Sequence, residues 1–118
     1  MPRTDQHLRK AQHDEEFVAS LGVDPGRFTD WAVTGLFYSA VHYIEAYFAR
    51  GNRHSGDHRA RDSEIWRDGQ LKRLYEPYNE LKNHSITARY LVRTPTAQDL
   101  ADSRQSLRAI KTEILKLV

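Results

Sequence analysis

Histidine and arginine occur together twice in this chain, each time separated by about one helical turn. The segment Asn79–Tyr90, NELKNHSITARY, contains His84 and Arg89, and an earlier segment contains His58 and Arg61. Metal-independent cleavage of RNA needs an acid or base, most often histidine, and a cation that stabilises the charge developing on the phosphoryl group. His58, His84 and Arg89 are therefore candidate catalytic residues, although such pairs also arise by chance in a chain with 18 Lys and Arg and six His.

Basic side chains are concentrated in the segment Arg50–Arg61, RGNRHSGDHRAR, where Asp57 is the only acidic residue. Four of these side chains define a basic patch: Arg50, Arg53, His54 and Arg59. The patch could receive an anion such as phosphate, or it could be an ordinary solvated loop, and the sequence leaves both readings open. The formal net charge of +2 is well below that of a protein that coats DNA.

Metal-binding and nucleotide-binding motifs are missing from the sequence. The chain has no cysteine, which excludes thiolate zinc sites and disulfides. His54 and His58 are four residues apart, but Gly56 lies between them and interrupts the helix that would align their rings. Di-iron bundles use Glu-x-x-His, whereas Glu80 and His84 are four residues apart. Because Gly-rich phosphate loops and Gly-x-Ser-x-Gly motifs are also missing, we predict no metal site and no cofactor.

Apolar residues recur at helical spacing throughout the chain, and strand signals are nearly absent. Turn residues divide this pattern into five stretches. The expected helices are Thr4–Leu21, Asp30–Arg50, Asp57–Asp68, Leu71–Val92 and a last one from Thr96 to the chain end. We therefore predict an all-α fold, an up-and-down bundle of four long helices plus one short helix, formed by a single domain of residues 1–118.

Local signals indicate where these helices begin and bend. Three threonines precede helical patterns and are expected N-caps: Thr4, Thr29 and Thr96. Asp99 completes a capping box with the last of them, and Phe28 is placed to pack onto Val33 as a hydrophobic staple. Pro77 lies inside the expected fourth helix and should kink it, because proline removes one backbone hydrogen bond.

The second helix, WAVTGLFYSAVHYIEAYFA, is apolar on nearly all sides, which is typical of the buried centre of a bundle. His42 within it is expected to be a core histidine. In the fourth helix, apolar positions alternate three and four residues apart along one seam: Leu71, Leu74, Tyr78, Leu81, Ser85, Ala88 and Val92. Ser85 therefore points towards the bundle, and Arg89 lies one turn further along the same side.

The composition indicates a soluble globular protein, since 39% of the residues are hydrophobic and 29% are charged. No apolar run approaches the roughly 20 residues that a membrane-spanning helix needs. The N-terminal segment MPRTDQHLRKAQHDEEF has no apolar signal-peptide core. We therefore expect a cytoplasmic protein that does not associate with membranes.

Two segments of the sequence resemble a known domain. They are LFYSAVHYIEAYFARGNRHSGDHRARDSEIW and YEPYNELKNHSITARY, and together they resemble the HEPN domain, a small helical bundle of nucleotide- and RNA-associated proteins. The resemblance covers about Asp30–Tyr90. It is carried by the small and aromatic residues of the second helix and by a spaced pattern that joins His58 and Arg61 to Tyr78, Leu81, Ser85, Ala88, Arg89 and Tyr90.

The resemblance implies a homodimer, because HEPN subunits usually pair so that their motifs face one groove. Many HEPN proteins are metal-independent RNases that use an Arg followed a few residues later by a His. This chain departs from that pattern, because Ser85 stands at the Arg position and Tyr90 at the His distance. We infer a groove lined by His58, Arg61, Ser85, Arg89 and Tyr90. Alternatively, Arg89 pairs with an acid of the short helix, Asp62 or Glu64, and only joins two helices.

These observations leave three hypotheses for the function. The first is a HEPN-like binding module, dimeric, that engages RNA, a nucleotide or a nucleotidyltransferase-type partner such as an antitoxin. The second is a metal-independent RNase of a toxin–antitoxin or defence system that uses His58, His84 and Arg89 in a relocated arrangement. The third is a structural protein that only dimerises.

Overall fold

The computed structural model describes residues 1–118 and contains five α-helices, two short 3₁₀ turns and no β-strand. The helices are α1 (Thr4–Ser20), α2 (Thr29–Arg50), α3 (His58–Arg67), α4 (Tyr75–Tyr90) and α5 (Ala97–Leu117). The 3₁₀ turns, Gly26–Phe28 and Lys72–Leu74, directly precede α2 and α4. The prediction of an all-helical fold is confirmed.

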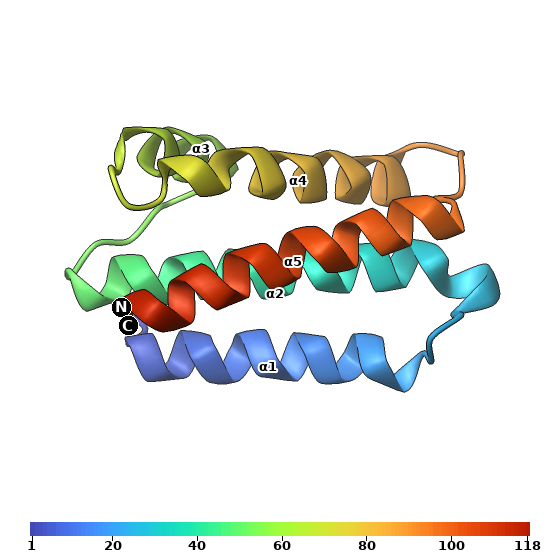
Figure 1. Ribbon diagram of the computed structural model, residues 1–118, viewed down its shortest axis with the longest axis horizontal. Coiled ribbons are helices and arrows are strands. Elements are labelled where there is room, and N and C mark those ends of the chain that lie inside the picture. The colour runs from blue at the N-terminus through green and yellow to red at the C-terminus, as the bar shows by residue number, and fades with distance from the viewer.

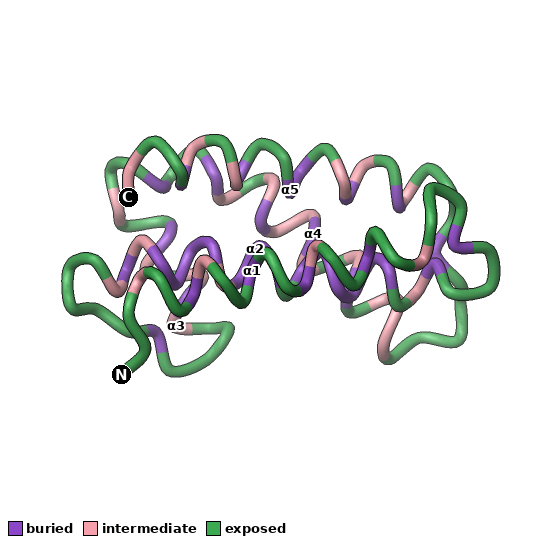
Figure 2. Tube along the Cα trace, turned by 90° about the horizontal axis from the view of Figure 1, so that it is seen from below, coloured by how far each residue is buried: buried purple, intermediate pink, exposed green.

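The five helices surround one hydrophobic core in a molecule of 40 × 24 × 22 Å. Helix α2 contacts α1, α4 and α5, while the short α3 packs beside α4 (Figure 1). Both chain termini lie at the same end of the molecule (Figure 1). Buried residues recur along the helices, whereas the connecting loops are mostly exposed (Figure 2). None of the helices combines the length and the apolarity that crossing a membrane requires.

Helix α2 is the centre of this core, as its composition predicts, because 15 of its 22 residues are buried. Its small residues let α1 approach closely. A Cβ added at Gly35 would lie 2.7 Å from the side chain of Val18, so only glycine fits there without a shift. The Ser39 hydroxyl donates a hydrogen bond of 2.9 Å to the carbonyl of Ala11, which satisfies a buried polar group.

Of the three expected N-caps, only Thr96 is confirmed. Its hydroxyl accepts a hydrogen bond of 3.1 Å from the backbone N–H of Asp99, whose carboxylate accepts one of 2.9 Å from the backbone N–H of Thr96. Thr29 is already helical, because the preceding 3₁₀ turn continues into α2, and its hydroxyl donates to the carbonyl of Gly26. Thr4 is the first residue of α1, and its hydroxyl donates to the carbonyl of Ala46 in α2.

The hydrophobic staple expected at Phe28 requires a buried ring, but the Phe28 ring is 43% exposed. The guanidinium of Arg27 lies 4.9 Å from the centroid of the Phe28 ring instead. In α1, Ala11 and Val18 are buried, whereas Phe17 is 43% exposed. The segment that leads into α2 is therefore fixed by the 3₁₀ turn Gly26–Phe28 and not by packing of the Phe28 ring.

Pro77 does not kink a helix, because α4 begins only two residues before it, at Tyr75. In the first turn of a helix the backbone N–H groups have no intrahelical partner, so proline removes no bond there. Helix α4 also ends at Tyr90, earlier than expected, and Val92 is fully exposed. The predicted seam is buried from Leu71 to Ser85 and opens beyond that residue.

Candidate functional site

Arg61 of α3 is buried and forms an ion pair with Glu45 of α2. The Arg61 Nε donates to Glu45 Oε1 over 2.9 Å, and the two residues are only 7% and 3% exposed. The Arg61 Nη1 donates further hydrogen bonds to the Nδ1 of His58 over 2.9 Å and to the hydroxyl of Tyr78 over 3.4 Å. Arg61 is buried and its three partners come from α2, α3 and α4, so it joins these helices and does not line a groove.

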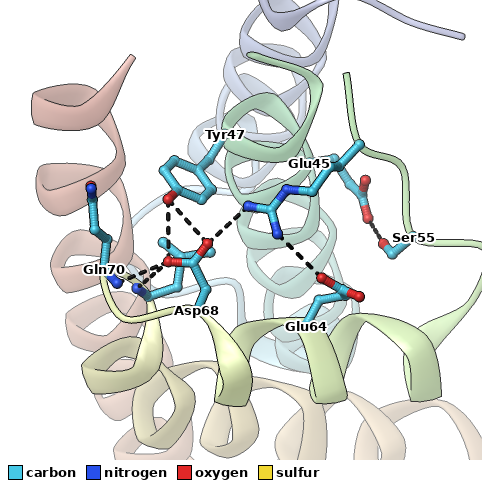
Figure 3. Close-up of polar contacts among 8 residues, drawn as sticks. Glu45, Tyr47, Ser55, Glu64, Asp68 and Gln70 are labelled. Atoms are coloured by element: carbon cyan, nitrogen blue, oxygen red, sulfur yellow. Dashed lines mark hydrogen bonds and ion pairs between the residues drawn. The ribbon is translucent and has the colours of Figure 1, made fainter. Parts of the chain in front are cut away.

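Glu45 is also bonded to the loop between α2 and α3. Its carboxylate accepts a hydrogen bond from the hydroxyl of Ser55 (Figure 3). The other carboxylate oxygen is buried without a hydrogen-bond partner and lies 3.9 Å from the Nδ1 of His54. His54, expected in a basic patch, is thus held beside an acidic side chain.

Arg89, near the end of α4, has no carboxylate partner. Its Nη1 donates a hydrogen bond of 2.8 Å to the hydroxyl of Tyr38 in α2, and its Nε donates to the backbone carbonyl of Ser85 over 3.3 Å. The guanidinium carbon lies 5.0 Å from the ring centroid of Tyr90, 5.5 Å from that of Tyr38 and 5.9 Å from that of Phe37. An arginine surrounded by rings keeps its full positive charge and several free N–H donors.

His58 and Arg89 both lie against the buried ring of Phe37. The His58 ring centroid is 5.6 Å from the Phe37 centroid. Partial burial lowers the pKa of His58, and the positive charges of Arg61 and Arg89 lower it further. A neutral His58 that accepts a hydrogen bond from Arg61 at Nδ1 carries its proton on Nε2. The free side of the ring is therefore a hydrogen-bond donor.

Four residues form the surface around this arginine, which we call the Arg89 cradle: Tyr38, His58, Arg89 and Tyr90. Tyr38 is 38% exposed and Tyr90 is 72% exposed. Ser85, expected to line the groove, is completely buried, and its hydroxyl has no hydrogen-bond partner. Of the five expected groove residues, the structure brings His58, Arg89 and Tyr90 to one surface and places Arg61 and Ser85 beneath it.

The alternative in which Arg89 pairs with an acid of the short helix is wrong. Asp62 forms its ion pair with Lys82 of α4, and Glu64 forms one of 3.2 Å with Arg53. These contacts, together with the pair of Arg61 and Glu45, hold α3 in place. Arg89 therefore makes no ion pair with α3, and its hydrogen bond to Tyr38 joins α4 to α2 instead.

The expected basic patch is not a continuous cationic surface. Arg53 pairs with Asp68 over 2.8 Å as well as with Glu64. Asp68 in turn accepts hydrogen bonds from the hydroxyl of Tyr47 and the backbone N–H of Gln70 (Figure 3). Arg50 and Arg59 are exposed and have no ion-pair partner. The loop is thus fixed by internal pairing, and only its two ends present a free positive charge.

His84 does not belong to the Arg89 cradle. At about 100° per residue along a helix, the step of five residues from His84 to Arg89 separates their side chains by about 140° around α4. The His84 imidazole lies 3.7 Å from Glu80 on α4 and 3.9 Å from Asp99 on α5. The relocated arrangement of His58, His84 and Arg89 that an RNase would need is therefore not assembled.

His42, expected to be an isolated core histidine, has a partner that the sequence did not reveal. Its Nδ1 lies 3.1 Å from the Nδ1 of His7 in α1. Burial lowers the pKa of both imidazoles. The two rings therefore join α1 to α2 in their neutral forms.

Two residues of this region, Glu45 and Tyr38, were missed by sequence reasoning. Glu45 is the only carboxylate between Asp30 and Asp57, and a buried acid in so apolar a stretch requires a cationic partner. That signal predicts a buried ion pair but not which arginine makes it. Tyr38 carries no such signal.

Comparisons with protein-family models, with curated proteins and with solved structures give no significant match to this chain.

Proposed function

We propose that this protein is a HEPN-like binding module of the cytoplasm, an up-and-down bundle of four long helices and one short one, that binds single-stranded RNA or a nucleotide at the Arg89 cradle. The observation that carries the proposal is the guanidinium of Arg89, which has aromatic neighbours and a tyrosine hydroxyl but no carboxylate. An arginine that only stabilised the fold would be expected to have an acidic partner, as Arg61 has.

The chemistry of the cradle suits a phosphate next to a base. A guanidinium offers two parallel N–H donors to a phosphate, and the Nε2–H of His58 can add a third donor. The half-exposed ring of Tyr38 and the exposed ring of Tyr90 offer faces on which bases stack. Stacking of this kind tolerates any base, so we expect little sequence preference.

The proposed dimer rests on an apolar surface beside the cradle. Tyr90, Leu91 and Val92 follow one another in the chain and are 72%, 56% and 104% exposed. An exposed run of this kind marks a contact surface, and a second copy of the chain would bring two cradles together as in HEPN proteins. Sedimentation should show a dimer that Val92→Glu dissociates, and a wild-type monomer would overturn this part. The nucleotidyltransferase-type partner stays a prediction from the resemblance.

Fluorescence anisotropy with a labelled single-stranded RNA at low salt tests the binding. We expect Arg89→Ala to weaken binding by about 5- to 150-fold, since one desolvated contact of this type contributes roughly 1–3 kcal/mol. Arg108→Ala is the matched control, because Arg108 is an exposed arginine of α5 with no ion-pair partner. Equal affinity of both variants would contradict the proposal, and no binding by the wild type would favour the structural dimer.

The RNase hypothesis ranks second. Its support is the neutral imidazole of His58 near two arginines. However, the bond from Arg61 occupies the only lone pair of the neutral His58 ring, so the ring cannot act as a base, and the Nε2–H of a neutral imidazole is too weakly acidic to protonate a leaving group. Cleavage of the same RNA in EDTA that is abolished by His58→Ala would favour the enzyme, whereas intact RNA after long incubation would favour binding alone.

A further inference from the structure

A group of metal-ligand residues lies between α4 and α5, on the side of α4 that faces away from the Arg89 cradle. Glu80 and His84 come from successive turns of α4, and Asp102 comes from α5. One ligand atom from each lies within 4.8 Å of the other two. The His84 Nε2 and the Glu80 Oε1 are 3.7 Å apart.

These distances are close to those of an occupied site. In a tetrahedral zinc site with bonds of 2.0–2.2 Å, the ligand atoms lie about 3.3 Å from one another. The 3.7 Å between His84 and Glu80 exceeds this value by less than 0.5 Å. The other pairs lie within 4.8 Å of one another, so binding requires the flexible side chains of Glu80 and Asp102 to move closer to His84.

Each candidate ligand has a second polar group of the protein beside it. The Nδ1 of His84 lies 3.9 Å from the carboxylate of Asp99, somewhat beyond hydrogen-bond distance, and the Nε2 lies 3.7 Å from Glu80. A carboxylate behind a ligating histidine is the usual partner that fixes its tautomer. The second oxygen of Glu80 accepts a hydrogen bond of 3.2 Å from the buried hydroxyl of Ser106.

The third ligand, Asp102, also has a hydrogen-bond partner, and a cleft leads from solvent to the carboxylates. The amide of Gln98 donates to Asp102 over 2.8 Å. Glu80 and Asp102 both line a surface cleft of about 320 Å³ between α4 and α5, which also includes Glu76 and Ser106. An ion in solution can therefore reach the carboxylates without opening the core.

We propose that Glu80, His84 and Asp102 bind one divalent transition-metal ion, with Zn²⁺ the best fit. One imidazole and two carboxylates suit zinc, whereas Mg²⁺ and Ca²⁺ prefer sites made of oxygen only. Three protein ligands leave a coordination position for water. The ion joins α4 to α5 and so stabilises the helix that carries the Arg89 cradle.

The sequence pattern hides this site for a physical reason. Glu80 and His84 do not have the Glu-x-x-His spacing of di-iron bundles, yet residues four apart on a helix share a face. The third ligand, Asp102, is 18 positions beyond His84 and meets it only because α4 and α5 pack together. A motif search along the chain cannot find a site that two helices assemble.

Isothermal titration of the full chain with Zn²⁺, after EDTA treatment and dialysis, tests the proposal. We expect one ion per chain and a rise in Tm on its addition. The near-isosteric variants Glu80→Gln and Asp102→Asn should each weaken zinc binding at least tenfold, and His84→Gln should weaken it as strongly. Circular dichroism should show unchanged helix content in all three variants.

Histidines elsewhere in the chain provide the matched controls. His13→Gln removes an exposed imidazole of α1, and His42→Gln removes one ring of the pair with His7. Neither change should alter the affinity for zinc. No zinc binding at millimolar concentration, binding that survives Glu80→Gln and Asp102→Asn, or binding that is lost in His42→Gln would each overturn the proposal. RNA affinity is measured in a separate experiment. A negative result with zinc would therefore overturn the metal site without affecting the proposal for the Arg89 cradle.

Discussion

Two arginines that lie against the same aromatic core have opposite surroundings. Arg61 is buried, and its charge is balanced by Glu45 at 2.9 Å. Arg89 is partly exposed, and its neighbours are three aromatic rings and the hydroxyl of Tyr38. Both are linked through His58, which bonds to the first and has its pKa lowered by both charges.

This difference distinguishes the stabilising contacts of Arg61 from the binding role that we propose for Arg89. A buried charge needs an internal partner, because leaving it unpaired costs several kcal/mol. A partly exposed guanidinium can remain without one, since water satisfies its donors until a ligand replaces the water. The comparison therefore predicts that loss of Arg61 affects folding and loss of Arg89 affects binding.

The largest effect is expected for Arg61→Ala. Removal of this side chain leaves the carboxylate of Glu45 buried without its cation, and breaking a buried pair in this way costs about 3–5 kcal/mol. Urea denaturation followed by circular dichroism measures the loss in the free energy of unfolding.

Arg59→Ala is the matched control for this measurement. Arg59 lies on the same helix, is exposed and has no ion-pair partner, so its removal should change the free energy of unfolding by about 0.5 kcal/mol or less. Equal losses in the two variants would remove the proposed distinction between paired and unpaired arginines.

The second effect is expected for the hydroxyl that orients Arg89. Tyr38→Phe keeps the ring but removes the acceptor of the 2.8 Å hydrogen bond. We expect RNA affinity to fall a few-fold, less than for Arg89→Ala, while the free energy of unfolding changes by about 1 kcal/mol or less. Anisotropy and urea denaturation on the same samples check both parts, and a variant that loses stability but not affinity would reverse the assignment.

The third effect concerns pH, because His58 titrates between two arginines that stay charged. Burial, Arg61 and Arg89 lower the pKa of His58 in the free protein. A bound phosphate offsets the repulsion from Arg89 and so favours the protonated ring. Binding therefore takes up a proton, and affinity should rise as the pH falls from 7.5 to 5.5, by no more than about tenfold per pH unit for one coupled proton.

His58→Gln should flatten this pH dependence of RNA affinity, because glutamine does not titrate in that range. Affinity that decreases on acidification of the wild type, or a profile that His58→Gln leaves unchanged, would show that His58 does not contact the ligand.

The smallest effect is expected for Ser85→Ala. The Ser85 hydroxyl is buried and has no hydrogen-bond partner, so its removal relieves a desolvation cost of about 1–3 kcal/mol, part of which is offset by the space left behind. Stability should be equal to or slightly above that of the wild type, with unchanged RNA affinity. A clear loss of RNA affinity would show that Ser85 contributes to the binding surface after all.

The helices could be predicted from sequence because their signals are local. Apolar periodicity and the capping box of Thr96 and Asp99 involve residues at most a few positions apart. The errors at Thr29 and Pro77 have one cause: 3₁₀ turns precede α2 and α4, and these shift the helix starts relative to the expected caps.

The candidate site could be predicted only in part, because its contacts join distant positions. Sequence reasoning found His58, Arg89 and Tyr90, whose residue types suggest chemistry by themselves. The bond from Arg89 to Tyr38 spans 51 positions, and the pair of Arg61 and Glu45 spans 16. Whether Arg61 or Arg89 pairs with the buried Glu45 depends on how α2 and α3 pack, and no local sequence pattern predicts this packing.

The salt dependence of RNA binding tests the central distinction most directly. Each phosphate contact to a single strand contributes about 0.7 to the slope of log affinity against log salt concentration. Removal of Arg89 should reduce the magnitude of this slope by about 0.7 per cradle, whereas Arg108→Ala should leave it unchanged. A slope that Arg89→Ala does not alter would contradict the assignment of Arg89 as the residue that binds the phosphate.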